Sequence, residues 1–120
     1  MEYKRSDRVA ELIQREIAGM LQRGIKDPRV AGVTVTGADV SPDLRHARVY
    51  YVLHGSAEER ENASRGLSKA KGFIRREIGK RLQLRYAPEI DFRYDASLDY
   101  GDKINRLLKE IKKETKIDEE

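Results

Sequence analysis

The sequence predicts one α+β domain, a two-layer sandwich in which amphipathic helices cover one face of a three-stranded sheet. The length, 120 residues, suits one compact domain with a core and is short for two. The hydrophobic period switches along the chain in the order helix, strand, strand, helix, helix, strand, and a further C-terminal helix follows. Three strands need a covered face to be stable, and the helices supply it. We place this domain at residues 1–112.

A first helix is predicted from about Asp7 to Gln22, with Ser6 as its N-cap. Apolar residues recur there at steps of three and four and form one stripe. The sequence Asp27-Pro28 prevents the helix from continuing, because proline lacks a backbone donor and restricts the residue before it. The stripe consists of Val9, Leu12, Ile13, Ile17, Met20 and Leu21.

Two strands joined by a turn come next and should form an antiparallel hairpin. Residues 33–40 alternate apolar and β-branched polar side chains, with a possible bulge at Gly37. Residues 41–44, Ser-Pro-Asp-Leu, have turn chemistry. In the second strand Ala47, Val49, Tyr51 and Leu53 share one face.

The long segment after the hairpin predicts a helix, a kink and a second helix. Ser56 and Glu59 match a capping box, and the first of these helices should run to about Lys69. Gly72 interrupts the pattern before the second helix begins. The buried side of that second helix is expected to carry Phe73, Ile74, Ile78 and Leu82.

The C-terminal part predicts one more strand and one more helix. Pro88 ends the helical pattern, and Ile90, Phe92 and Tyr94 alternate with polar residues as a third strand. An amphipathic helix should follow, and residues 113–120 form a charged tail that is expected to fray. Its apolar positions are Ile104, Leu107, Leu108 and Ile111.

The composition argues against catalysis, metals and cofactors. The chain has no cysteine, and its two histidines, His46 and His54, lie too far apart on an extended strand to share a metal ion. Phosphate loops, dinucleotide fingerprints and nucleophile elbows are absent from the sequence. We therefore expect no catalytic residue, metal site, cofactor or small-molecule substrate. No segment is apolar enough for a membrane span or a signal peptide, so we expect a cytoplasmic protein without membrane contact.

The charge distribution points to a polyanionic partner. Net charge is only +4, yet residues 65–85 contain eight basic side chains and one acid, Glu77, so the rest of the chain is net acidic. One acid cannot neutralise this segment through intrahelical pairs, whereas a phosphate backbone could. Both phenylalanines are expected to be buried, which favours recognition of RNA shape and backbone over base stacking. The candidate RNA-binding residues are Lys69, Lys71, Arg75, Arg76, Lys80, Arg81 and Arg85, with Arg45 and Arg48 on the hairpin as secondary candidates.

The basic segment is also compatible with three alternative roles. It could be an ordinary solvated helix face. It could also bind DNA, since the same charge attracts any polyanion. A module that docks a protein through the hairpin edge or the C-terminal helix is a third alternative, and it predicts binding that survives high salt.

Six stretches of the chain form a joint pattern: residues 25–29, 40–44, 47–50, 72–75, 84–90 and 101–108. Together they resemble one family, ribosome-binding factor A, within the type II KH-like proteins. A typical KH domain clamps nucleotides with a Gly-x-x-Gly loop, which is missing here, but the family's Ala-x-Gly kink matches Ala70-Lys71-Gly72. The resemblance implies a KH type II-like αββααβ fold and a monomeric bacterial factor. It also implies binding to the immature small ribosomal subunit and its ribosomal RNA, with support for late maturation, rRNA processing and cold adaptation.

Overall fold

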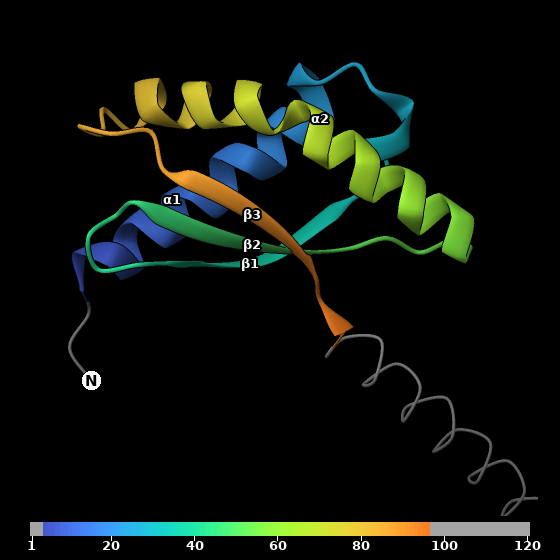
Figure 1. Ribbon diagram of the computed structural model, residues 1–120, viewed down its shortest axis with the longest axis horizontal. Helices are drawn as coiled ribbons and strands as arrows, with labels where there is room; N and C mark the ends of the chain where they lie inside the picture. The colour runs from blue at the N-terminus through green and yellow to red at the C-terminus, as the bar shows by residue number, and fades with distance from the viewer. Residues whose placement is uncertain (1–3, 97–120) are drawn as a thin grey trace, which may run out of the picture.

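The computed structural model describes residues 4–96, which form two α-helices and a three-stranded sheet (Figure 1). The C-terminal helix predicted around residues 104–111, the tail at 113–120 and the domain boundary at residue 112 lie outside the described residues. The elements, in order, are α1 (Arg5–Gly19), a π-helical turn (Met20–Gly24), a 3-10 turn (Pro28–Val30), β1 (Thr34–Val40), β2 (His46–Val52), α2 (Ala57–Arg81) and β3 (Glu89–Tyr94).

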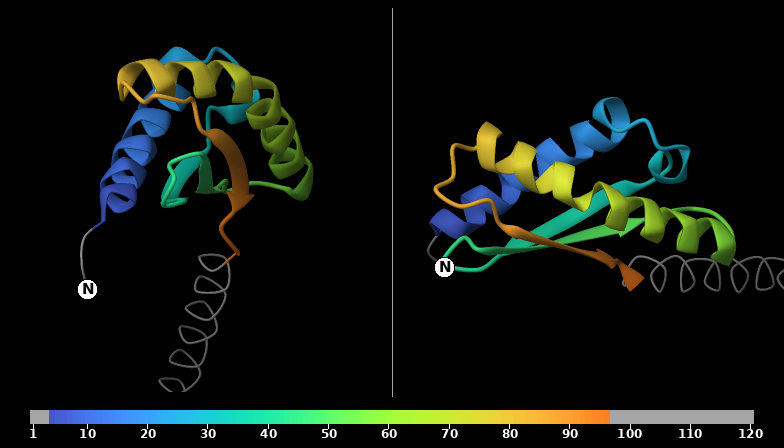
Figure 2. Two further views of the ribbon diagram at one scale, coloured as in Figure 1. Left: turned by 60° about the vertical axis from the view of Figure 1, so that its left-hand side comes forward. Right: turned by 45° about the horizontal axis from the view of Figure 1, so that its top comes forward.

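The central strand of the sheet is β2. It pairs antiparallel with β1, as predicted for the hairpin, and parallel with β3. A parallel pair needs a crossover connection, and α2 is the helix of that crossover. Figure 2 shows α1 and α2 on the same face of the sheet, which confirms the two-layer arrangement. The expected bulge is present one residue early: Val35 pairs with Tyr51 and Gly37 with Tyr50, so Thr36 is the extra residue.

The core lies between the sheet and the two helices. Along β2 the buried side chains Ala47, Val49 and Tyr51 alternate with the more exposed His46 and Arg48 and the half-buried Tyr50, as the period of two predicted. The helices contribute the fully buried side chains Ile13 and Ile17 from α1 and Leu67, Ile74 and Ile78 from α2.

The N-terminus of α1 differs from the prediction. Lys4, not Ser6, is the N-cap, and Ser6 is buried inside the helix. The carboxylate of Asp7 accepts the backbone N–H of Lys4 at 2.9 Å, which satisfies a donor that the helix leaves free. Leu12, counted in the apolar stripe, is 37% exposed because it lies at the edge of that stripe.

The predicted division into two helices at Gly72 is wrong, because α2 is one helix that runs through this residue. The capping box is present: the Ser56 hydroxyl accepts the N–H of Glu59 at 3.1 Å. Residues 70–72 contain no proline, and Gly72 keeps a negative φ, so the backbone hydrogen bonds can continue. The helix bends near its middle instead of breaking, as both views show (Figures 1 and 2). The element order of residues 4–96 is therefore αββαβ.

Candidate nucleic-acid interface

Arg75, a predicted RNA-binding residue, is engaged within the fold. Its Nε and Nη2 atoms donate to the carbonyl oxygen of Ala87 at 3.4 and 3.3 Å, and Nη2 lies 2.9 Å from a carboxylate oxygen of Glu89. Both partners lie where the chain enters β3. Arg75 therefore ties α2 to the third strand, and much of its hydrogen-bonding capacity is already used.

Arg81 is engaged in a similar way, at the end of α2. Its Nη1 donates to Glu16 of α1 at 3.0 Å, and its Nε donates to Glu77 one turn earlier at 3.2 Å. The hydrogen bond to Glu16 is the largest of the effects that raise the pKa of the Arg81 guanidinium. Arg81 connects the two helices, so its charge is largely compensated.

Four other cations of α2 form no ion pair in the described residues. Lys69, Arg76 and Lys80 are exposed and Lys71 is half-buried, and no ion pair within residues 4–96 involves any of the four. Arg76 and Lys80 follow Lys69 by about two and three helical turns, so the three side chains form one row along the helix. The buried residues Ile74 and Ile78 lie on the opposite side of α2. This cationic row, defined by Lys69, Arg76 and Lys80, faces solvent and forms no ion pair in the described residues, and Lys69 lies near enough to Asp27 to help lower the pKa of that carboxyl.

A second cationic group forms where the hairpin turn meets the loop after α2. The guanidinium carbons of Arg45 and Arg85 lie 4.8 and 5.5 Å from the centroid of the Tyr86 ring, which is 52% exposed. The turn that presents Arg45 is held by Asp43, whose carboxylate accepts the Arg45 backbone N–H at 3.1 Å and the Ser41 hydroxyl at 2.6 Å. These bonds, the one from Ser41 being the larger effect, lower the pKa of Asp43. The fold thus brings together two candidate arginines that are distant in the sequence.

Arg48 lies apart from both groups. It belongs to the face of β2 opposite to the buried Val49, and Asp39 and Asp91 are its neighbours across the sheet. The Tyr50 hydroxyl beside it is the main cause of its raised pKa. The acidic surroundings make Arg48 a poorer phosphate ligand than the cations of α2.

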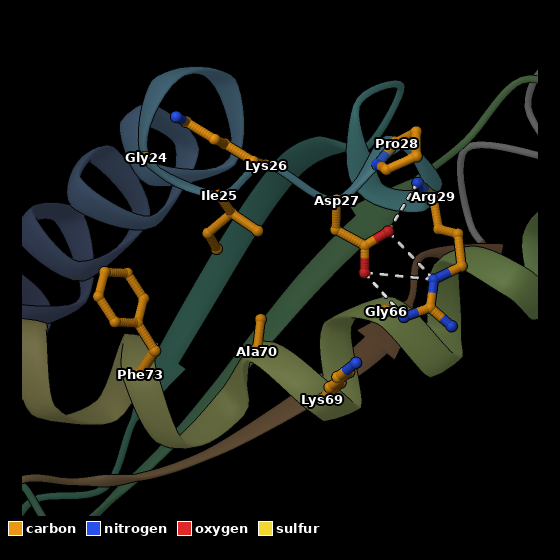
Figure 3. Close-up of a pocket in the computed structure, with 10 residues that line it drawn as sticks. All are labelled: Gly24, Ile25, Lys26, Asp27, Pro28, Arg29, Gly66, Lys69, Ala70 and Phe73. Carbon is orange, nitrogen blue, oxygen red and sulfur yellow. Dashed lines mark hydrogen bonds and ion pairs between the residues drawn. The ribbon is translucent and has the colours of Figure 1, made fainter.

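A pocket with a volume of about 500 Å³ lies between residues 24–29 and the middle of α2 (Figure 3). The close approach depends on Gly66, where an added Cβ would lie 2.8 Å from the buried side chain of Val30. Ala70 and Lys69 line the pocket, whereas Gly72 is exposed outside it. The pocket therefore lies between the segment before β1 and the part of α2 that carries Lys69, the first residue of the cationic row.

One wall of the pocket is a fixed ion pair. The Asp27 carboxylate accepts the backbone N–H of Arg29 at 3.0 Å and the guanidinium Nε and Nη2 at 2.8 to 3.2 Å. The hydrogen bond from the guanidinium is the largest of the effects that lower the pKa of Asp27 to about 2. The same pair raises the pKa of Arg29. Both groups stay charged at neutral pH, and the guanidinium plane is held in place.

Phe73 also lines the pocket, although the sequence pattern predicted it to be buried. Its side chain is 39% exposed. In a helix of about 3.6 residues per turn, Phe73 is four positions after Lys69 and so lies close to the cationic row. The aliphatic residues that follow it occupy the side facing the sheet. Neither this ring nor Arg29 was among the predicted site residues, although the helical spacing to Lys69 could have indicated the first.

Residues 4–96 contain no group of three or more histidine, aspartate or glutamate side chains positioned to hold a metal ion. None of the helices in this described range combines the length and the apolar character needed to cross a membrane.

The family model of ribosome-binding factor A matches residues 5–108 of the chain. The chain belongs to the ribosome-binding factor A family. Its relatives include ribosome-binding factor A of Syntrophobacter fumaroxidans, 56% identical over 94% of this chain and 98% of the relative. Another is that of Geobacter metallireducens, 52% identical over 91% and 92% of the two chains.

Solved structures of ribosome-binding factor A share the fold. The crystal structure of the Thermus thermophilus protein matches with a TM-score of 0.65 and 25% identity, over 74% of this chain and 94% of that one. The solution structure of a Thermotoga maritima protein described as a putative ribosome binding factor A matches with a TM-score of 0.58 and 37% identity, over 70% and 84%. A homology model of the Thermus thermophilus factor, fitted into the cryo-EM map of its 30S complex, matches with a TM-score of 0.59 and 26% identity, over 70% and 88%.

Two of the stretches that carried the resemblance to ribosome-binding factor A meet in the pocket. Residues 25–29 form one side of it, and Phe73, from the stretch 72–75, forms part of the other. A third stretch, 84–90, contains Arg85 and Tyr86 of the second cationic group and Ala87, which binds Arg75. These stretches lie together around α2 in the structure.

Proposed function

We propose that this chain is a ribosome assembly factor that binds the small ribosomal subunit and its ribosomal RNA. In this proposal it supports late rRNA processing and small-subunit maturation and contributes to cold adaptation. It acts in the cytoplasm as a monomer, without a cofactor or enzymatic activity. Membership of the ribosome-binding factor A family supports the proposal, as does the similarity to the Thermus thermophilus factor fitted into a 30S complex.

The observation that carries the RNA-binding part is the cationic row of α2. Lys69, Arg76 and Lys80 are exposed along one side of the helix, without ion-pair partners in the described residues. Arg76 and Lys80 are one turn apart and repel each other, and a phosphate backbone along the row would relieve that repulsion while releasing condensed counterions. An ordinary solvated helix face would be expected to interleave acids among such cations.

We assign different roles to the nine candidate residues. The cationic row and the half-buried Lys71 contact phosphates, and Arg45 and Arg85 extend the surface across the Tyr86 ring. Arg75 and Arg81 mainly hold the fold together, because their guanidinium groups already bind α1, α2 and the start of β3. Arg48 is the weakest candidate because acids flank it.

The KH type II-like character of the domain is part of the proposal. The bend lies near the middle of α2 (Figure 1), and Ala70-Lys71-Gly72, the Ala-x-Gly sequence that replaces a Gly-x-x-Gly loop, belongs to the central turns of this helix. A bent helix can follow a curved backbone while presenting its cations toward it.

Cosedimentation of the purified chain with isolated small subunits, large subunits and duplex DNA, over a range of salt concentrations, tests this proposal. We expect association with small subunits that is preferred over the other two and weakens as salt increases. Equal binding to all three would indicate a basic domain that binds polyanions nonspecifically. Binding that survives high salt would favour a protein-docking module instead.

A further inference from the structure

The pocket between residues 24–29 and α2 combines an exposed aromatic ring with cations. Figure 3 shows Phe73 on one side of Ala70 and the Asp27–Arg29 pair on the other, so that a ring and a guanidinium group flank the same space. Lys69 lines the pocket from α2, and Lys26 lies on the opposite rim with its exposed side chain directed outward (Figure 3). The carboxylate of Asp27 is occupied by its bonds to Arg29 and leaves the pocket with an excess of positive charge.

We infer that this pocket binds one unstacked nucleotide of single-stranded RNA, with its base stacked on Phe73 and its phosphates bound by Lys26 and Lys69. The inference rests on the proposed RNA-binding function and deepens it. It assigns a place where the protein contacts a base of a single strand, whereas the cationic row alone contacts only phosphates.

The chemistry of the pocket fits a nucleotide better than an apolar side chain of a protein partner. Unstacked bases stack on aromatic rings and on arginine guanidinium planes, and this pocket offers one of each. Its volume of about 500 Å³ is in the range of small-ligand sites. An apolar peptide side chain would leave Lys69 and the Asp27–Arg29 pair near an uncharged group, which desolvates charges without compensation.

The position of Phe73 on α2 also connects the pocket to the proposed RNA path. Lys69 precedes it by about one turn and Arg76 follows by about one turn, both on the same side of the helix. A strand whose phosphates follow these cations would therefore pass over the ring. Duplex RNA could bind the same cations, but its bases are stacked inside the helix and cannot reach Phe73.

Fluorescence titration of the full chain tests the inference with two probes. One is a short single-stranded oligoribonucleotide carrying a fluorescent purine analogue, and the other is the same strand paired with its complement. The variants are Phe73→Ala, Phe73→Leu and Lys26→Gln, and Leu12→Ala is the control because it removes a similarly exposed apolar side chain from α1. Thermal unfolding shows whether each variant is folded.

We expect Phe73→Ala to weaken single-strand binding about 5- to 150-fold, which corresponds to about 1–3 kcal/mol for one base stacked on an aromatic ring. Phe73→Leu should weaken it nearly as much, because leucine keeps apolar surface but has no π face. Duplex binding should be unchanged in both variants. Lys26→Gln should reduce the salt dependence of single-strand binding by about 0.7 units of slope.

Three results would separate the possibilities. If Phe73→Ala binds the single strand as tightly as Leu12→Ala does, the pocket does not stack a base and the inference is overturned. If it loses small-subunit binding but keeps single-strand binding, the pocket docks a protein, which also overturns it. If single-strand binding depends on Phe73 while the wild type fails to sediment with small subunits, the pocket inference stands and the proposed function falls.

Discussion

Replacing Gly66 with alanine tests how tightly residues 27–30 pack against α2. A Cβ at this position would lie 2.8 Å from Val30 Cγ1, 3.2 Å from Asp27 Oδ2 and 3.3 Å from Arg29 Cβ. Val30 is fully buried, so it cannot move aside without disturbing the core. Gly72 is a matched control in the same helix, because an added Cβ there meets only the end of the Arg76 side chain, at 3.6 Å.

The expected magnitudes follow from two opposing effects. Alanine is favoured over glycine inside a helix by about 0.8–1.0 kcal/mol, and neither glycine has a positive φ that would forbid the change. Overpacking a tight core site costs about 1–3 kcal/mol. Gly72→Ala should therefore raise the free energy of unfolding by up to about 1 kcal/mol. Gly66→Ala should fall below it by about 1–3 kcal/mol, since the helix effect cancels in the comparison.

Urea unfolding of the full chain, followed by far-UV circular dichroism, measures both variants. The urea concentration at the midpoint of unfolding should be higher for Gly72→Ala than for the wild type. For Gly66→Ala it should be lower than for Gly72→Ala, and the slopes should be similar. The Gly66→Ala variant should also bind single-stranded RNA less tightly, because residues 27–30 must shift and the pocket changes shape. If both variants are stabilised equally, the close approach at Gly66 is refuted.

Further predictions concern the ion-paired side chains of Asp27 and Arg75 and the exposed ring of Tyr86. Because the pKa of Asp27 falls from 3.8 to about 2 on folding, its ion pair stabilises the protein fully above about pH 3.8 and is lost as the pH falls toward 2. The difference in unfolding free energy between wild type and Asp27→Asn should accordingly be constant near neutral pH and shrink in acid, and a difference independent of pH would contradict this. Arg75→Gln should lower the free energy of unfolding by about 1 kcal/mol, through loss of its bonds to the Ala87 carbonyl, without changing the salt dependence of RNA binding. A fall in that slope would instead place Arg75 on a phosphate. Tyr86→Leu should lower the free energy of unfolding by about 0.5–1 kcal/mol, because the guanidinium groups of Arg45 and Arg85 lose their contacts with the ring. Urea unfolding measures this difference, and an unchanged free energy would contradict the contribution of these contacts.

The parts of the fold that could be predicted depend on local signals. Alternation at Ala47, Val49 and Tyr51 identified both the strand and its buried face. The capping box at Ser56 and Glu59 located the start of α2 to within a residue. Such patterns reflect interactions between near neighbours, which the sequence displays directly.

Which cations of α2 form ion pairs could not be predicted, because their partners lie far away in the chain. Within the basic segment itself, Glu77 is the only acid able to neutralise a neighbour. The fold adds Glu16 from α1, which binds Arg81, and Glu89 at the start of β3, which binds Arg75. Which cations remain unpaired follows from the packing of α2 against α1 and β3, and no helical wheel contains that information.

The two errors in α2 have separate physical causes. Gly72 weakens a helix, but without proline nearby the backbone hydrogen bonds continue, so the segment is one bent helix and not the two helices that were predicted. Phe73 was placed with Ile74 on the buried side because large aromatic rings are usually covered. The segment 24–29 stops short of covering it and leaves a pocket instead.

The most direct test of the central claim is the salt dependence of binding to isolated small subunits. The wild type is compared with Arg76→Gln/Lys80→Gln, which removes two unpaired cations, and with Arg75→Gln/Arg81→Gln, which removes two cations engaged in the fold. We expect the plot of log binding constant against log salt concentration to lose about 1.4–1.8 units of slope in the first double variant and to keep its slope in the second. Equal losses of slope in both, or none in either, would contradict the assignment of RNA binding to the unpaired cations of α2.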